Sequence, residues 1–449
     1  MFIGREAELK FLNHYYGLSG SQLLIVYGQK GVGKTALLKH FSKDIGYCYY
    51  QARACSGREQ RYQWGAELQA AQAKLSRYPE YQELFEGALS AQSLSPGRSK
   101  KQIGIIDEFQ YLVKGDEEFF PELVRFVRNR QKDNPCMIIL STSASGWVEN
   151  NMLQRIGASA SALSGLLKVR ELKFQDIMKV FPEYSRENGM LIYAALGGVA
   201  GLWQSFSPEL SAGENIIRHL IDKYSRLYRE ISVYMAEELR EPAVYNTILA
   251  AMAKDCTKLN DIYRHTGFSR AKISVYLKNL MELDLVEKIY SFESEGYANT
   301  KKGIYRISNS YVRFYFRYLF PNQSRLRELS PEEFYHCVVE DSYADFTEEA
   351  YRRICREQMA ESYASVGEWI GKTGNLDIVA RDTKGNITIC SCSYGRQMTI
   401  QDYEWLAYHI RQAKLKPARV ILFCEKGFDG GLGQMARESN VILRSILSE

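Results

Sequence analysis

The chain has 449 residues, of which 45% are hydrophobic and 25% are charged, and its formal net charge is only +5. This length exceeds what one compact core normally holds, so we expect two or three domains, and the ordinary composition argues against extended disorder. The small net charge excludes a field that would draw the whole chain to nucleic acid or membrane, so any basic surface must be local.

The cysteines and the N-terminal segment indicate the compartment. Nine cysteines are scattered without a C-x-x-C pair, which favours reduced thiols over a zinc site or a disulfide framework. The segment MFIGREAEL lacks the pattern of a signal peptide, and no apolar run approaches the roughly 20 residues that span a bilayer. The sequence therefore predicts a cytoplasmic protein without a membrane partner.

The first 170 residues alternate short apolar runs with amphipathic helical stretches, which is typical of a parallel sheet wrapped by helices. The runs are LLIVY at 23–27, YCYYQAR at 47–53, QIGIID at 102–107, CMIILS at 136–141 and a fifth run centred on 168–172. We therefore predict an α/β domain over 1–170. From 171 to 240 helical periodicity replaces the strand pattern, which predicts a helical lid.

The first apolar run leads into a phosphate-binding motif. The sequence GQKGVGKT fits G-x-x-x-x-G-K-[ST], with a strand before it and an amphipathic helix after it. Glycines let the loop curl so that backbone N–H groups face phosphate oxygens, Lys34 would neutralise the β and γ phosphates, and Thr35 would hold Mg²⁺. The candidate nucleotide-binding residues of this P-loop are Gly28, Gln29, Lys30, Gly31, Val32, Gly33, Lys34, Thr35 and Ala36.

An acidic pair should complete the site at the end of a neighbouring strand. QIGIIDEFQYL supplies Asp107, which would orient Mg²⁺ through water, and Glu108, which would polarise the attacking water as general base. A polar residue that senses the γ-phosphate is expected at the tip of the next strand, where we select Thr142. The predicted catalytic residues are thus Lys34, Glu108 and Thr142, with Thr35 and Asp107 at the metal.

Downstream of the lid, three short helical segments precede an extended hairpin over 241–320, and this order predicts a winged helix. Residues 321–331 resemble a linker. The part from 330 to 449 carries a long helix at 332–359, two strands around the turn DTKGN, a helix at 399–413 and the strand RVILFC. It is predicted to form a separate small α/β domain.

The segments FIGREAEL, GQKGVGKT, IIDEFQYL and LGGV, together with the serine-rich strand end, resemble the archaeal-type ATPase family. This family belongs to the signal-transducing P-loop ATPases related to AAA+ proteins. The resemblance implies ATP and Mg²⁺ as cofactors, and a winged helix followed by a restriction-endonuclease-like domain.

Three short elements of the family pattern carry further implications. The resemblance places the G-R-E segment beside the adenine, which makes Arg5 and Glu6 candidates for the nucleotide pocket, although the same residues would also serve as a plain helix start. The glycine-arginine of the family reads Ser164-Gly165-Leu166 here, and its GGxP element reads 197–200 as GGVA. Binding should survive these departures, whereas turnover should be slow or require an arginine from a partner.

The winged helix has a weakly basic recognition face. Ser269 is a plausible N-cap for a helix that presents Lys272 and Lys278, and the wing adds Lys301 and Lys302. These four lysines are the candidate DNA-binding residues. The sequence leaves contact with duplex DNA and packing of the wing against neighbouring domains as open alternatives.

The resemblance to the nuclease-like module is carried by VGEWIG, LDIVARD and ITICSCSY. A metal-dependent nuclease of this fold needs an Asp on one strand and Glu-x-Lys on the next. Asp377 fills the first position, but the second falls on Ser391-x-Ser393, and where members have Phe-Glu this chain has Tyr351-Arg352. We therefore expect a nuclease-like fold without nuclease chemistry.

These expectations leave three hypotheses of function. The first is an ATP-driven switch that couples nucleotide state to DNA, to a protein partner or to self-association. The second is an ATP-dependent DNA-processing nuclease, and the third is a scaffold that nucleotide merely stabilises.

Overall fold

The computed structural model describes residues 3–90, 101–130, 134–238, 241–292 and 303–447. The chain divides into two compact units. The first comprises Met1–Leu172 with the short segments Val199–Gly201 and Glu282–Asp284, and the second comprises the remaining residues.

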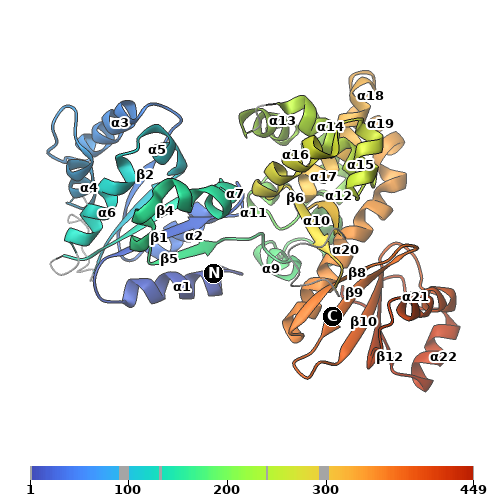
Figure 1. The fold of residues 1–449 in the computed structure, drawn as a ribbon. Helices are drawn as coiled ribbons and strands as arrows, with labels where there is room; N and C mark the ends of the chain where they lie inside the picture. The colour runs from blue at the N-terminus through green and yellow to red at the C-terminus, as the bar shows by residue number, and fades with distance from the viewer. Residues whose placement is uncertain (1–2, 91–100, 131–133, 239–240, 293–302, 448–449) are drawn as a thin grey trace. The chain divides into compact units, whose positions relative to one another are not determined.

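The first unit is built on a parallel five-stranded sheet in the order β2-β3-β4-β1-β5 (Figure 1). Its strands are β1 (Gln22–Tyr27), β2 (Cys48–Gln51), β3 (Gln102–Asp107), β4 (Cys136–Thr142) and β5 (Gly165–Lys168). Its helices are α1 (Glu6–Gly17), α2 (Lys34–Ser42), α3 (Gly57–Ala70), α4 (Tyr81–Ser90), α5 (Gln110–Gly115), α6 (Phe119–Asn129), α7 (Ser145–Trp147) and α8 (Leu153–Ile156).

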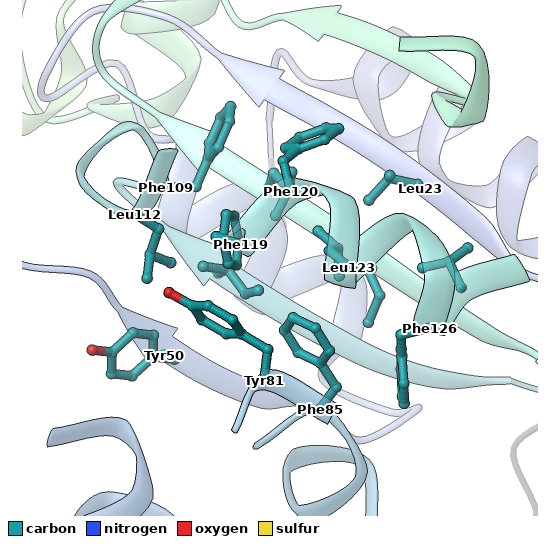
Figure 2. Packing of buried hydrophobic residues seen from close by; sticks show 14 of the residues in the cluster. Leu23, Tyr50, Tyr81, Phe85, Phe109, Leu112, Phe119, Phe120, Leu123 and Phe126 are labelled. Carbon is teal, nitrogen blue, oxygen red and sulfur yellow. The ribbon is translucent and has the colours of Figure 1, made fainter. Parts of the chain in front are cut away.

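Alternating side chains bury both faces of this sheet. On β1, Leu24 and Val26 pack with the apolar residues of α1 and α2, whereas Leu23 and Ile25 pack with those of α3 to α6. Figure 2 shows the second cluster, in which aromatic rings from α4 and α6 meet; the ring centroids of Phe85 and Phe126 lie 5.2 Å apart. Burial on both faces explains why these strands are almost continuously apolar.

The second unit begins with the helices of the lid and continues into the winged helix, although the start of α11 and the last residue of α16 belong to the first unit. The lid helices are α9 (Phe174–Val180), α10 (Arg186–Leu196), α11 (Ala200–Trp203), α12 (Ala212–Ile216) and α13 (Arg226–Glu238). The winged helix consists of α14 (Pro242–Met252), α15 (Leu259–Thr266), α16 (Arg270–Glu282) and the antiparallel hairpin β6 (Val286–Tyr290) and β7 (Gly303–Ile307). The backbone N–H of Lys272 donates to Ser269 Oγ at 3.2 Å, so Ser269 caps α16 as the sequence predicts.

The C-terminal part of the second unit holds a mixed sheet in the order β12-β11-β10-β9-β8. Its helices are α17 (Ser310–Phe314), α18 (Gln323–Glu328), α19 (Pro331–Phe334), α20 (Asp341–Ser362), α21 (Ile400–Gln412) and α22 (Gly430–Glu438). Its strands are β8 (Ser365–Ile370), β9 (Asn375–Arg381), β10 (Ile387–Ser393), β11 (Arg419–Cys424) and β12 (Val441–Arg444). Strands β8, β9 and β10 pair antiparallel, and β10, β11 and β12 pair parallel.

The predicted fold class is confirmed, with differences in detail. The fifth strand lies at Gly165–Lys168 rather than around 168–172, because Leu24 to Tyr27 of β1 pair with those earlier residues. The predicted linker at 321–331 contains α18, and the long helix of the C-terminal domain begins at Asp341 after a π-helical turn. No helix in the described residues is long and apolar enough to cross a membrane.

Candidate nucleotide-binding site

The P-loop joins the carboxyl end of β1 to the first turn of α2. A Cβ at Gly28 would lie 2.2 Å from the carbonyl oxygen of Val169, so only glycine fits there. Gly31 and Gly33 have φ angles of +85° and +99°, which side chains disfavour. Because a glycine precedes Lys34 at the start of α2, the first N–H groups of the helix are not capped by a side chain. The loop therefore fits an anion such as a phosphate.

Lys34 is directed back into this loop. Its ammonium donates hydrogen bonds to the carbonyl oxygens of Gly28 at 2.8 Å and Gln29 at 3.0 Å, and the residue is 6% exposed. Burial lowers the pKa of Lys34, and the charges of Glu108 and Asp107 oppose that shift. The cation is thus held inside the curl of the loop, close to two carboxylates.

Thr35 and Asp107 meet although 71 residues separate them in the chain. The hydroxyl of Thr35 donates to Asp107 Oδ2 at 3.0 Å, and Asp107 is 5% exposed at the end of β3. A hydroxyl and a carboxylate are hard oxygen donors, the type that Mg²⁺ prefers when substrate phosphates and water complete its shell. The two residues that the sequence assigns to the metal therefore fit that ion.

Asp107 has further donors. The phenol of Tyr49 donates to the same Oδ2 at 2.7 Å, and the backbone N–H of Glu108 donates to Oδ1 at 3.0 Å. Burial raises the pKa of Tyr49, and its hydrogen bond to Asp107 raises it further, so the phenol remains a donor. Tyr49 did not emerge from the sequence, because nothing local shows that β2 lies beside β3.

Glu108 lies in a turn with a φ angle of +52° at the end of β3. Its carboxylate accepts hydrogen bonds from the hydroxyl of Ser143 at 2.9 Å, from the backbone N–H of Ser143 at 3.1 Å and from Gln110 Nε2 at 2.8 Å. The candidate general base is therefore restrained by the tip of β4 and by α5, and the sequence predicts neither Ser143 nor Gln110 as a partner of Glu108.

Thr142, the predicted sensor, has a fully buried side chain. Its hydroxyl donates to Gln110 Oε1 at 2.5 Å and accepts from the N–H of Ala144 at 3.0 Å, while its carbonyl oxygen accepts from the N–H of Gly28 at 3.3 Å. The structure thus brings Thr142 to the P-loop through its main chain. A role for its hydroxyl in sensing phosphate stays a prediction.

Arg5 supports the P-loop from the start of α1. Its guanidinium donates to the carbonyl oxygen of Val32 at 2.7 Å and pairs with Glu8 at 2.9 Å, and the residue is 4% exposed. Glu6 accepts from the N–H of Gly4 at 3.3 Å. Val32 is buried in the apolar cluster beneath the loop, whereas Lys30 and Ala36 are exposed. Arg5 is therefore a contact of the loop itself.

Two of the four candidate DNA-binding lysines lie on α16. Lys278 is exposed, and the ammonium of Lys272 lies 5.0 Å from the ring centroid of Phe268 and 5.6 Å from that of Tyr276. Lys301 and Lys302 lie outside the described residues. The residue after β6 meets the C-terminal sheet. Ser291 forms a β-bridge with Glu368, and its Oγ accepts a hydrogen bond from the N–H of Ile370 at 3.2 Å.

Asp377 of the C-terminal domain pairs with a cation. Its carboxylate lies 3.2 Å from Arg352 Nε and accepts from Ser391 Oγ at 3.3 Å and from the N–H of Cys392 at 3.0 Å. Burial lowers the pKa of Arg352, but the charges of Asp377, Glu349 and Glu348 outweigh it and raise that pKa overall. No group of three or more His, Cys, Asp or Glu in the described residues is arranged to hold a metal ion.

Comparison with known protein families identifies a domain in the N-terminal part of the chain. Residues 2–202 match the model of an ATPase domain found predominantly in Archaea. The match shows an archaeal-type ATPase domain over these residues. The archaeal ATPase domain includes the P-loop, Asp107 and Glu108, so the chain contains an ATP-binding P-loop domain of this class. Residues 246–288 match the arsR family of bacterial regulatory proteins, and residues 315–403 match archaeal and bacterial proteins of unknown function.

Individual relatives match different shares of the chain. An uncharacterized protein of Methanocaldococcus jannaschii is 25% identical over 399 residues, which cover 85% of this chain and 84% of that protein. An uncharacterized ATP-binding protein of the same organism is 44% identical over 44 residues, which are 10% of this chain and 75% of that protein. A Walker-type ATPase of Pyrococcus abyssi superposes with a TM-score of 0.51 at 16% identity, over 70% of this chain and 96% of that one, which shows a shared fold.

Proposed function

We propose that this archaeal-type ATPase is a nucleotide-driven switch that binds and hydrolyses ATP and couples its nucleotide state to a DNA or protein partner. The observation that carries the proposal is the 3.0 Å contact between Thr35 and Asp107, beside the P-loop ammonium of Lys34. Lys34 and Thr35 lie in the first turn of α2, and Asp107 lies at the end of β3. Parallel α/β folds bind ligands at this edge of the sheet.

Each residue has a role that its chemistry supports. The backbone N–H groups of the P-loop and Lys34 bind the phosphates, and Arg5 fixes the loop through Val32. Thr35 and Asp107 would hold Mg²⁺, which supplies charge neutralisation at the phosphates. Glu108 orients the attacking water and accepts its proton.

Turnover is proposed to be slow until a partner acts. The carboxylate of Glu108 is engaged by Ser143 and Gln110, so it must exchange these hydrogen bonds before it can polarise water. In addition, the family's glycine-arginine reads Ser164-Gly165-Leu166 in this chain. A partner that supplies an arginine would stabilise the charge that develops on the transferred phosphoryl group.

The ATPase domain is assigned to 1–170. Its nucleotide state is proposed to be passed on by the helical lid at 171–240, the winged helix at 241–320 and the C-terminal domain at 330–449. Arg306 of the wing pairs with Glu368 of the C-terminal sheet at 2.7 Å and with Glu349 of α20 at 3.1 Å. These contacts favour a winged helix and C-terminal domain that act as one body.

The C-terminal domain is proposed to be an inactive nuclease-like fold kept for binding or assembly. A catalytic magnesium site needs several carboxylates, but Asp377 is paired with Arg352, and the next strand offers Ser391 and Ser393. ATP-dependent DNA cleavage is the alternative. It requires Mg²⁺-dependent cutting that Asp377→Ala abolishes, whereas the switch predicts no cutting by the wild type.

The experiment that tests the switch is steady-state ATP hydrolysis with and without duplex DNA, in the wild type and in Lys34→Ala. We expect Mg²⁺-dependent hydrolysis by the wild type and none by Lys34→Ala. Stimulation by DNA identifies DNA as the partner through α16, and indifference to DNA points to a protein partner or self-association. Hydrolysis that is unchanged in Glu108→Gln would instead favour a scaffold that nucleotide only stabilises.

A further inference from the structure

Tyr49 and Tyr50 are consecutive residues of β2 with opposite surroundings. Because side chains alternate along a strand, Tyr50 enters the cluster under α3 and α4, where its ring stacks on Trp64 with centroids 4.4 Å apart. Tyr49 lies on the other face, packed against the cluster that α1 and α2 cover. The pairing of Gln51 with Asp107 places β2 beside the carboxyl end of β3.

The phenol of Tyr49 shares one carboxylate oxygen with the P-loop. Asp107 Oδ2 accepts from Tyr49 at 2.7 Å and from Thr35 at 3.0 Å. The two donors together engage the lone pairs of that oxygen, and they fix the rotation of the carboxylate. The ring itself is held by packing and by the ammonium of Lys39, which lies 5.5 Å from its centroid.

We propose that Tyr49 is a positioning residue for the Mg²⁺–nucleotide complex: its phenol holds the Asp107 carboxylate in the orientation that faces Thr35. The inference rests on the proposed ATP site and adds a residue to it. Removing a hydrogen-bond partner of a metal-binding carboxylate commonly weakens metal affinity about 10-fold to 100-fold. Without that partner, the carboxylate must give up its rotational freedom when it binds the metal.

The test compares Tyr49→Phe with Tyr50→Phe. Both variants lose one phenol from the same strand and keep the ring, and Tyr50 is the matched control because its hydroxyl donates to Gln60 Oε1 at 2.7 Å and not to Asp107. Binding of a fluorescent, non-hydrolysable ATP analogue is measured without Mg²⁺ and across a Mg²⁺ titration, and hydrolysis of ATP is measured over the same titration.

For Tyr49→Phe we expect the Mg²⁺ concentration at half-saturation to rise by about 10-fold. Binding of the analogue without Mg²⁺ should stay within about two-fold of wild type, and turnover should recover at saturating Mg²⁺. Tyr50→Phe should keep the Mg²⁺ dependence of the wild type even if its thermal stability falls.

The inference is overturned if Tyr49→Phe binds and responds to Mg²⁺ like Tyr50→Phe, or if both variants shift the Mg²⁺ dependence equally. Either result leaves the proposed ATP site intact. Failure of the wild type itself to bind the analogue would contradict the proposed function instead.

Discussion

The carboxylate of Glu108 accepts hydrogen bonds from two neighbours that come from different elements, Ser143 after β4 and Gln110 on α5. Hydrogen bonds to a charged group contribute about 1.5–3 kcal/mol each, which is enough to restrain a catalytic side chain. At the scale of single residues, the rate of hydrolysis therefore depends on how readily Glu108 leaves these partners.

The first prediction concerns this restraint. Ser143→Ala removes the hydroxyl but keeps the backbone N–H that also binds Glu108, so we expect basal ATP turnover to rise by about three-fold to ten-fold. Steady-state phosphate release measures the effect. Ser141→Ala is the control, because the hydroxyl of Ser141 is buried without a hydrogen-bond partner among the described residues. A fall in turnover in Ser143→Ala would show that Ser143 places Glu108 for catalysis instead.

At the scale of elements, the hairpin of the winged helix is joined to the C-terminal domain by buried charges. Glu368 of β8 is 6% exposed and pairs with Arg306 of β7 and with Arg356 of α20. Removing one partner from a buried ion pair leaves the remaining charge uncompensated, which is far more costly than losing an exposed pair.

We therefore predict that Glu368→Gln lowers the free energy of unfolding of the second unit by about 3 kcal/mol. Glu361→Gln is the control in the same unit, because Glu361 and its partner Lys173 are each 47% exposed, and its effect should stay below about 1 kcal/mol. Urea denaturation followed by circular dichroism measures both. Equal effects of the two substitutions would contradict a role for Glu368 in joining the hairpin to the C-terminal sheet.

The start of α21 supplies a prediction about pH. Arg396 donates to both carboxylate oxygens of Asp402 at 2.6 and 2.8 Å, and these bonds lower the pKa of Asp402 to about 2. A lowered carboxyl pKa contributes stability that is present above about pH 4 and is lost as the pH falls through about 2. Hydrogen exchange of the α21 amides should therefore be faster in Arg396→Ala than in wild type at pH 5, and the difference should shrink toward pH 2. A difference that does not depend on pH would contradict this account.

The sequence predicts elements that have a clear local pattern, and it does not predict contacts between segments that are distant in the chain. The strand before GQKGVGKT, the strand that ends at Asp107 and the helices of the winged helix follow from periodicity and caps, which are local properties. Strand β8 and strand β12 were not predicted, since the segment SVGEWI mixes glycine and glutamate with apolar residues and buries Glu368 through ion pairs with Arg306 and Arg356.

The same distinction applies to the site. The P-loop motif predicts Lys34 and Thr35 at the phosphates, and its chemistry calls for an acidic residue at the end of a neighbouring strand, which is Asp107. Tyr49 and Ser143 reach the carboxylates only through the strand order β2-β3-β4-β1-β5, which places β2 on one side of β3 and β4 on the other. A strand order is a long-range property, so single-chain patterns could not reveal these two contacts.

At the scale of the whole molecule, the proposal joins an ATP site in the first unit to a partner-binding body in the second. The residues named above for nucleotide binding all lie in the first unit, so ATP binding should not depend on the partner. The partner should instead change the rate of hydrolysis, since the proposed restraint lies on Glu108 and not on the P-loop.

The most direct test of the central claim is equilibrium binding of a fluorescent ATP analogue, with Mg²⁺, to the wild type and to Lys34→Ala. The account predicts saturable binding by the wild type and an affinity at least about 100-fold weaker in a Lys34→Ala variant with an unchanged circular dichroism spectrum. A folded wild-type sample that does not bind the analogue, or two proteins that bind it equally well, would contradict it.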